Sequence, residues 1–338
     1  MTSRRSSWLP IIVGLPSISL LSACSGVQSS LDPAGAAAQL IADLWWPMLV
    51  VAALVTVLVL ILLLISVFWS YRYRSARPLS HRQSRNLVIA GGIILPLSVT
   101  IPFALSSFSI GRTLYAPPPD NALAIEVIGK QWWWEIHYLD KNGDRIATTA
   151  NELHVPVGEP IKLLLKSDNV IHSFWVPNIQ GKTDMMPGQV NVTSLVADEP
   201  GVYRGQCAEY CGAQHALMAF LFIAEPEEDF DTWLEQQAQP AVAPKTNQAV
   251  QGREVFLDSG CASCHSIRGT RAQGDKGPDL THLAGRRTLA AATVANHIGH
   301  LGGWITDPQH IKPESLMPPT ELSPDELKAL LSYLEGLE

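Results

Sequence analysis

The stretch C-A-E-Y-C-G-A-Q-H-A-L-M, from Cys207 to Met218, carries the strongest structural signal in this 338-residue sequence. It places two cysteines, a glutamate, a histidine and a methionine within twelve positions. Thiolate, imidazole and thioether groups are the soft and borderline ligands that suit copper. We therefore expect this loop to bind copper through Cys207, Cys211, His215 and Met218.

Two other interpretations compete for the same loop. His172, in the upstream run D-N-V-I-H-S-F-W-V-P, follows another predicted strand and can close the site from the opposite side. With Cys207, Cys211 and His215 it would also supply the four nitrogen or sulfur ligands of a tetrahedral zinc centre. A disulfide between the two cysteines is the third interpretation. Met218 and the export signal described below favour copper, because methionine is a poor zinc ligand.

Short runs rich in apolar and β-branched residues flank the loop. They occupy residues 123–128, 161–166, 189–197 and 218–224. Several short strands separated by turn signals predict a β-sandwich or barrel. A short helix is expected at 227–237, after Pro226. We assign residues 115–235 to this all-β domain.

The β-domain is strongly acidic, with 7 lysines and arginines against 18 aspartates and glutamates in residues 115–235. The net charge of the whole chain is -7. Such a surface argues against a nucleic-acid partner and suits a cationic protein donor, which long-range electrostatics would steer towards it. A merely solvated acidic surface is the alternative for most of these residues.

The beginning of the chain resembles a secretory signal, with Arg4 and Arg5 before an apolar run at 8–21. It ends in L-S-A-C, which is typical of a bacterial lipoprotein signal. We therefore interpret residues 1–24 as that signal, and expect Cys24 to be lipidated and to become the mature N-terminus. An ordinary signal peptide with a chance cysteine is the alternative.

Two segments without charge, 44–69 and 87–110, each exceed the roughly 20 residues that a transmembrane helix needs. The loop between them carries five arginines and no acidic residue. Because basic loops remain in the cytoplasm, the residues after the second span should lie outside the cell membrane. We assign residues 25–112 to this two-helix part, and expect a larger membrane partner.

A second cofactor signal, C-A-S-C-H, begins at Cys261, after a linker rich in Gln, Ala and Pro at 236–248. This spacing is typical of covalent haem attachment. Cys261 and Cys264 would form the thioether bonds, and His265 would bind the iron. Zinc and redox-dithiol sites use related spacings, but the adjacent histidine and the export signal favour haem.

The distal iron ligand is expected far downstream, where Met317 is the only methionine after Met218. A Met/His pair is a known ligation of c-type haem. His297, His300 and His310 are the rivals for this position. The end of the chain shows a capping box and an apolar stripe at helical spacing, so a C-terminal helix should pack on a helix near residues 252–257.

The pattern C-x-E-x-C-x-x-x-H-x-x-M, with H-S-F-W-V-P upstream, resembles subunit II of the haem-copper cytochrome c oxidases. The resemblance implies a cupredoxin-like barrel that holds the dinuclear copper centre called CuA. By position, Cys207 and Cys211 would bridge the two copper ions. His172 and His215 would each bind one ion, and Met218 would be a weak ligand.

The resemblance also assigns roles to residues that composition alone would leave unmarked. The backbone carbonyl of Glu209 would be a weak copper ligand, and its side chain would help to hold magnesium at a subunit interface. Trp132, in Q-W-W-W, matches the tryptophan through which the family receives electrons. Without the resemblance, the three tryptophans would be interpreted as core packing with one exposed ring, or as a protein interface. Gly277-Pro278 resembles the loop that orients the haem histidine in class I cytochromes c.

From its first span onwards, the chain resembles a caa-type subunit II with a class I cytochrome c domain at 249–338. The implied architecture is a transmembrane hairpin, an all-β CuA domain and an all-α haem domain outside a bacterial cell membrane. Electrons would pass from cytochrome c or a cytochrome bc complex to haem and CuA. A catalytic partner, with subunits I and III, would reduce dioxygen and pump protons.

Two alternative functions remain at this point. The chain could be an electron-transfer subunit of another terminal reductase, of the nitric oxide reductase type, or a copper-binding assembly protein. The fused haem motif argues against copper delivery, because delivery needs no redox relay. A quinol-oxidase subunit II is excluded by the copper ligands, which that branch lacks.

Overall fold

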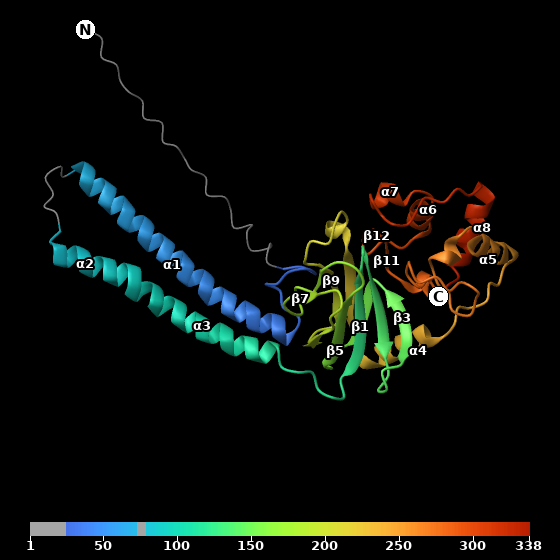
Figure 1. The fold of residues 1–338 in the computed structure, drawn as a ribbon, viewed down its shortest axis with the longest axis horizontal. Coiled ribbons are helices and arrows are strands. Elements are labelled where there is room, and N and C mark those ends of the chain that lie inside the picture. Colours follow the sequence, from blue (N-terminus) through green and yellow to red (C-terminus); the bar gives the residue numbers. More distant parts are fainter. Residues whose placement is uncertain (1–24, 73–78) are drawn as a thin grey trace, which may run out of the picture.

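The computed structural model describes residues 25–72 and 79–338. The expected signal segment, with Cys24, lies outside the described residues. Figure 1 shows two long helices and a helical C-terminal part on opposite sides of a β-domain. The order of these parts is the one that the hydropathy and motif patterns predict.

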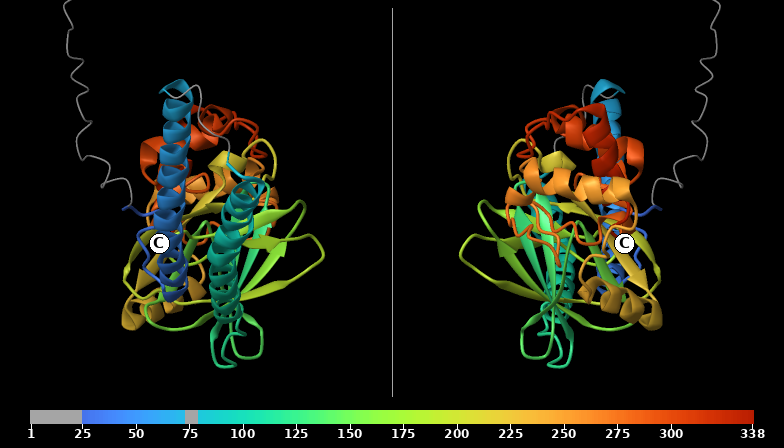
Figure 2. Two further views of the ribbon diagram at one scale, coloured as in Figure 1. Left: turned by 90° about the vertical axis from the view of Figure 1, so that its left-hand side faces the viewer. Right: turned by 90° about the vertical axis from the view of Figure 1, so that its right-hand side faces the viewer.

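Two long apolar helices form the N-terminal part. The first, α1 (Ala36–Arg72), contains the whole predicted span 44–69. The second consists of α2 (His81–Ile89), a π-helical turn η2 (Ala90–Ile94) and α3 (Leu95–Leu114). Figures 1 and 2 show the two helices side by side, pointing away from the sheets. Both are long and apolar enough to cross a membrane.

The β-domain consists of two mixed sheets. The first has the strand order β3-β2-β1-β5-β8, and the second has the order β4-β10-β9-β6-β7. Their bounds are β1 Leu123–Lys130, β2 Trp133–Leu139, β3 Arg145–Ala150, β4 Glu152–Pro156, β5 Ile161–Ser167, β6 His172–Trp175, β7 Thr183–Met185, β8 Asn191–Leu195, β9 Gly201–Cys207 and β10 Ala219–Glu225. Helix α4 (Glu227–Ala238) follows β10. The expected cupredoxin-like all-β fold is confirmed.

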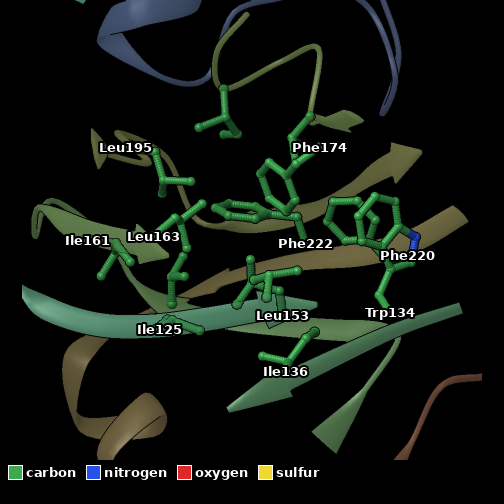
Figure 3. Close-up of a cluster of buried hydrophobic side chains, with 14 of the residues drawn as sticks. Ile125, Trp134, Ile136, Leu153, Ile161, Leu163, Phe174, Leu195, Phe220 and Phe222 are labelled. Carbon is green, nitrogen blue, oxygen red and sulfur yellow. The ribbon is translucent and has the colours of Figure 1, made fainter. Parts of the chain in front are cut away.

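The two sheets enclose one apolar core (Figure 3). Strand β5 shows the period of two that a half-buried strand requires, because Ile161 and Leu163 are fully buried while Lys162 between them is not. Trp134 packs edge-on against Phe220, with ring centroids 5.2 Å apart. The third tryptophan of the Q-W-W-W run is therefore a core residue.

The C-terminal part is mainly helical. It contains α5 Asn247–Asp258, η4 Cys261–Ser263, η5 Leu283–Gly285, β11 Thr288–Leu289, β12 Val294–Ala295, α6 Ile298–Thr306, α7 Pro308–Ile311 and α8 Pro324–Leu334. The helical expectation is confirmed, and the small hairpin of β11 and β12 is added to it. The capping box at the start of α8 is also confirmed, because the side chains of Ser323 and Glu326 each bond the other's backbone N–H.

Helices α5 and α8 pack closely where Gly252 meets Ala329. A Cβ atom on Gly252 would lie 1.9 Å from the carbonyl oxygen of Ala329, so no larger residue fits without moving a helix. We expect Gly252→Ala to lower the free energy of unfolding of this part by about 1–3 kcal/mol, the usual cost of overpacking. Thermal unfolding followed in the haem absorption band measures this. Gly285→Ala is the control, because a Cβ atom there has open space; equal stability of the two variants would contradict the prediction.

The segment between α4 and α5 is shorter than the expected linker 236–248, because α4 continues to Ala238 and α5 begins at Asn247. Its start is held by the C-terminal part. Nε2 of His282 lies 3.0 Å from the carbonyl oxygen of Gln239, and Nη1 of Arg268 donates to the carbonyl oxygen of Ala238 at 3.3 Å. These contacts fix the direction in which the chain leaves the β-domain.

Candidate metal and haem sites

The predicted copper ligands come from adjacent strand ends of one sheet. His172 begins β6 and Cys207 ends β9, and these two strands pair antiparallel through Phe174 opposite Cys207. The loop after β9 then returns to β10, and the backbone N–H of Cys207 donates to the carbonyl oxygen of Met218 at 2.8 Å. The strand pairing thereby brings both ends of the motif beside His172.

The five predicted ligand side chains converge around the two cysteine sulfurs. The Sγ atoms of Cys207 and Cys211 are 3.7 Å apart, far beyond the roughly 2.05 Å of a disulfide bond, so the disulfide interpretation is not supported. Nδ1 of His172 lies 3.8 Å from Sγ of Cys207. On the other side, Nδ1 of His215 and Sδ of Met218 each lie 3.7 Å from Sγ of Cys211.

Burial and protonation suit these side chains to a soft metal. His172, Cys207, Cys211 and Met218 are each at most 3% exposed. The contact with Cys211 lowers the pKa of Cys207 to about 3, and the same contact, together with burial, raises the pKa of Cys211. One thiolate thus forms readily. A cation between the two sulfurs would stabilise the second thiolate, because a metal ion deprotonates the thiol that coordinates it.

The orientation of the His172 ring is set by two residues that the sequence did not mark. Oδ1 of Asn169 lies 3.3 Å from Nε2 of His172, which leaves Nδ1 to face the sulfurs. Such a contact fixes the tautomer of a metal-binding histidine. Gly129 gives the ring its space, since a Cβ atom there would lie 2.8 Å from Cδ2 of His172.

Glu209 presents its carbonyl and its side chain to different neighbours. Its carbonyl oxygen lies 3.1 Å from Sγ of Cys207, at the metal side. Its carboxylate is 42% exposed and forms an ion pair with Nζ of Lys182 at 3.3 Å. The backbone is therefore near the predicted ligands, while the side chain is partly exposed and already paired with Lys182.

The tryptophan run connects the copper loop to the C-terminal part. Nε1 of Trp132 donates to the carbonyl oxygen of Cys211 at 3.0 Å, and Nε2 of Gln131 donates to the same oxygen at 2.8 Å. Trp132 and Trp133 are half-buried, whereas Trp134 is fully buried. Trp132 thus touches the backbone of a predicted copper ligand.

A cavity of about 1090 Å³ lies beside the C-A-S-C-H motif and contains all of its predicted haem residues. Cys261, Cys264, His265 and Met317 line it, whereas His297, His300 and His310 do not. Nδ1 of His265 lies 2.8 Å from the carbonyl oxygen of Pro278, as the loop resemblance implies. This contact orients the ring and leaves its other nitrogen for a metal.

Burial lowers the pKa of His265, which keeps the imidazole neutral and able to bind iron. Gly277 lies directly against this ring, since a Cβ atom there would be 2.6 Å from Cε1 of His265. Arg286 also lines the cavity, and its Nε atom is buried without a hydrogen-bond partner. A group with an anionic edge would satisfy this guanidinium. These features fit a haem.

The same cavity is closed on its other side by the β-domain. Lys130, Gln131, Trp132, Trp133, Asn151, Asp168 and Asn169 line it there. The predicted haem site and the tryptophan run therefore share one cavity.

Comparisons with known proteins agree with this arrangement. Residues 137–224 match the family model for the periplasmic domain of cytochrome c oxidase subunit II, and residues 249–338 match the model for cytochrome c. Cytochrome c oxidase subunit 2 of Alkalihalophilus pseudofirmus is 34% identical over 329 residues, which cover 94% of each chain. The chain belongs to the cytochrome c oxidase subunit II family.

Further subunit II proteins are similar to this chain. Subunit 2 of Bacillus subtilis is 31% identical over 344 residues, which cover 94% of each chain. The crystal structure of the periplasmic domain of subunit II from Bradyrhizobium japonicum shares 31% identity, covers 36% of this chain and 96% of that chain, and has a TM-score of 0.34.

The family assignment decides between the open interpretations of the cofactors. A subunit II domain implies CuA copper and a cytochrome c domain implies haem. The chain is thus part of an oxidoreductase complex that includes subunit I and accepts electrons from a cytochrome c donor. The reductase and assembly-protein alternatives are not favoured.

Proposed function

We propose that this subunit II accepts electrons at a covalent haem c and passes them through Trp132 to a CuA centre, from which subunit I receives them for the reduction of dioxygen. The supporting observation is that the haem cavity borders Trp132, whose Nε1 donates to the carbonyl oxygen of Cys211. Trp132 therefore lies between the predicted haem cavity and a predicted copper ligand.

In this proposal Cys207 and Cys211 would hold two copper ions between their sulfurs, and His172 and His215 would each supply a nitrogen ligand. Met218 and the carbonyl of Glu209 are weak ligands, consistent with their contacts to Cys211 and Cys207. The bound centre would supply a one-electron carrier whose charge is shared by two ions. Burial of His172, Cys207, Cys211 and Met218 would limit the rearrangement that accompanies each electron.

The carboxylate of Glu209 is proposed to help hold magnesium at the contact with subunit I. Its 42% exposure supports this role, because the carboxylate is accessible at the surface of the domain. Subunit III is proposed as a further membrane partner.

Cys261 and Cys264 are proposed to form the thioether bonds of haem c, with His265 and Met317 as axial ligands. All four line one cavity, and the carbonyl of Pro278 holds the ring of His265. A cytochrome c or a cytochrome bc complex is the proposed donor.

We also propose a multi-pass topology with the copper and haem domains on the outer side of a bacterial cell membrane. The five arginines between the apolar segments 44–69 and 87–110 support a cytoplasmic connection. Lipidation of Cys24 would add a third attachment to the membrane.

Metal analysis and spectroscopy of the full chain, purified in detergent, test the proposed function. We expect two copper ions that share one unpaired electron, seen by electron paramagnetic resonance, and one c-type haem per chain. A chelator that removes copper should abolish the resonance signal and leave the haem absorption unchanged. One zinc ion per chain and no copper signal would overturn the proposal.

A further inference from the structure

A buried carboxylate of the copper domain (residues 115–238) is held by the haem domain (residues 247–338). Glu152 begins β4 and is only 2% exposed. Its Oε1 accepts hydrogen bonds from the backbone N–H groups of Arg287 at 2.8 Å and Thr288 at 2.9 Å, and from Oγ1 of Thr288 at 3.2 Å. All three donors belong to the haem domain.

The amino group of a buried lysine makes the reciprocal contact. Lys312 follows α7 in the haem domain and is 4% exposed. Its Nζ donates to the carbonyl oxygen of Trp132 at 2.7 Å. The haem domain thus donates a hydrogen bond to Trp132, and Trp132 in turn donates one to the copper loop.

These buried contacts between the two domains exceed what a flexible connection between them would need. Removing a carboxylate or an amino group from water is unfavourable unless hydrogen bonds replace its hydration. In this chain the replacement comes from the opposite domain in both cases. Two peripheral contacts support the same arrangement: Nζ of Lys130 donates to the carbonyl oxygen of Asp275 at 3.2 Å, and Nη1 of Arg204 donates to that of Ala292 at 3.1 Å.

We propose that Glu152 and Lys312 are positioning residues that dock the haem domain on the copper domain in one orientation, and so reserve the face of Trp132 and Trp133 for the chain's own haem. The two contacts together are called the clasp. An external donor protein then meets the haem domain and has no access to this tryptophan face. The inference rests on the proposed function, because that function gives the face its importance.

Hydrogen–deuterium exchange of the full chain in detergent tests the clasp without relying on activity. Glu152→Ala and Lys312→Met should each speed exchange about tenfold in peptides that cover residues 286–295 and 131–134, because a lost bond to a buried charge favours local opening by this order. Glu152→Gln keeps an acceptor oxygen and should restore protection. Glu159→Ala and Lys328→Met change exposed residues of the same two domains and should leave exchange unchanged.

A second measurement separates positioning from general stability. The rate constant for electron transfer from haem to copper, after flash reduction of the haem, should fall in Glu152→Ala and Lys312→Met, while the copper and haem spectra stay unchanged. If one of the two variants fails to fold, the measurement on the other still tests the proposal. Unchanged exchange and an unchanged rate in a variant that retains copper and haem would overturn the clasp. A wild-type chain that lacks copper or haem would instead overturn the proposed function.

Discussion

Replacing Cys207 by alanine is expected to abolish copper binding and leave the haem in place. Cys207 lies between the Cys211 sulfur at 3.7 Å and the His172 nitrogen at 3.8 Å, so its removal separates the two halves of the ligand set. Loss of an outer partner of a metal ligand already costs 10–100-fold in affinity, and loss of a bridging ligand should exceed about a hundredfold. Copper content per chain and the resonance signal measure the effect.

The control for this experiment is Tyr210→Phe, on the same loop. The Tyr210 side chain is 76% exposed and lies outside the ligand set, so copper content should remain that of the wild-type chain. The haem absorption band reports folding of the haem domain in both variants. A Cys207→Ala chain that still binds its full copper would show that this cysteine is not a bridging ligand.

Residues in local motifs could be predicted from the sequence because their roles depend on spacing along the chain. The copper loop, the C-A-S-C-H motif and the capping box at Ser323 each form within a few residues of chain. His172 could be proposed as a ligand from the sequence because it follows a predicted strand. In the structure it begins β6, which pairs with β9 and therefore lies beside Cys207.

The residues that join the domains could not be predicted, because only tertiary contacts distinguish them. Glu152 lies in T-A-N-E-L-H and resembles the other acids of an acidic domain, yet it is buried by the haem domain. Lys312 belongs to no sequence motif that would have indicated its role. Trp132 was expected, from the resemblance, to be the tryptophan through which electrons enter, and the sequence did not indicate its hydrogen bonds to Cys211 and Lys312.

Met317→Leu is expected to keep the covalent haem and lose its methionine ligation. Leucine has a similar volume, so the cavity should remain filled, and the thioether bonds of Cys261 and Cys264 do not depend on the distal ligand. A thioether ligand raises the iron potential. The potential should therefore fall by a substantial part of the roughly 0.8 V range over which axial ligands set it. Redox titration and the charge-transfer band of methionine-ligated ferric haem measure the change.

Ile298→Ala is the control in the same domain, because its side chain is 51% exposed and does not line the cavity, so neither band nor potential should change. An unchanged spectrum in Met317→Leu would assign the distal position to another residue. The geometry argues against His297, His300 and His310 as the distal iron ligand. None of them lines the cavity, and His297 and His300 lie against each other, with ring centroids 3.7 Å apart. A histidine could replace Met317 only if α6 or α7 were rearranged, because the cavity as it stands is lined by Met317 and by none of these histidines.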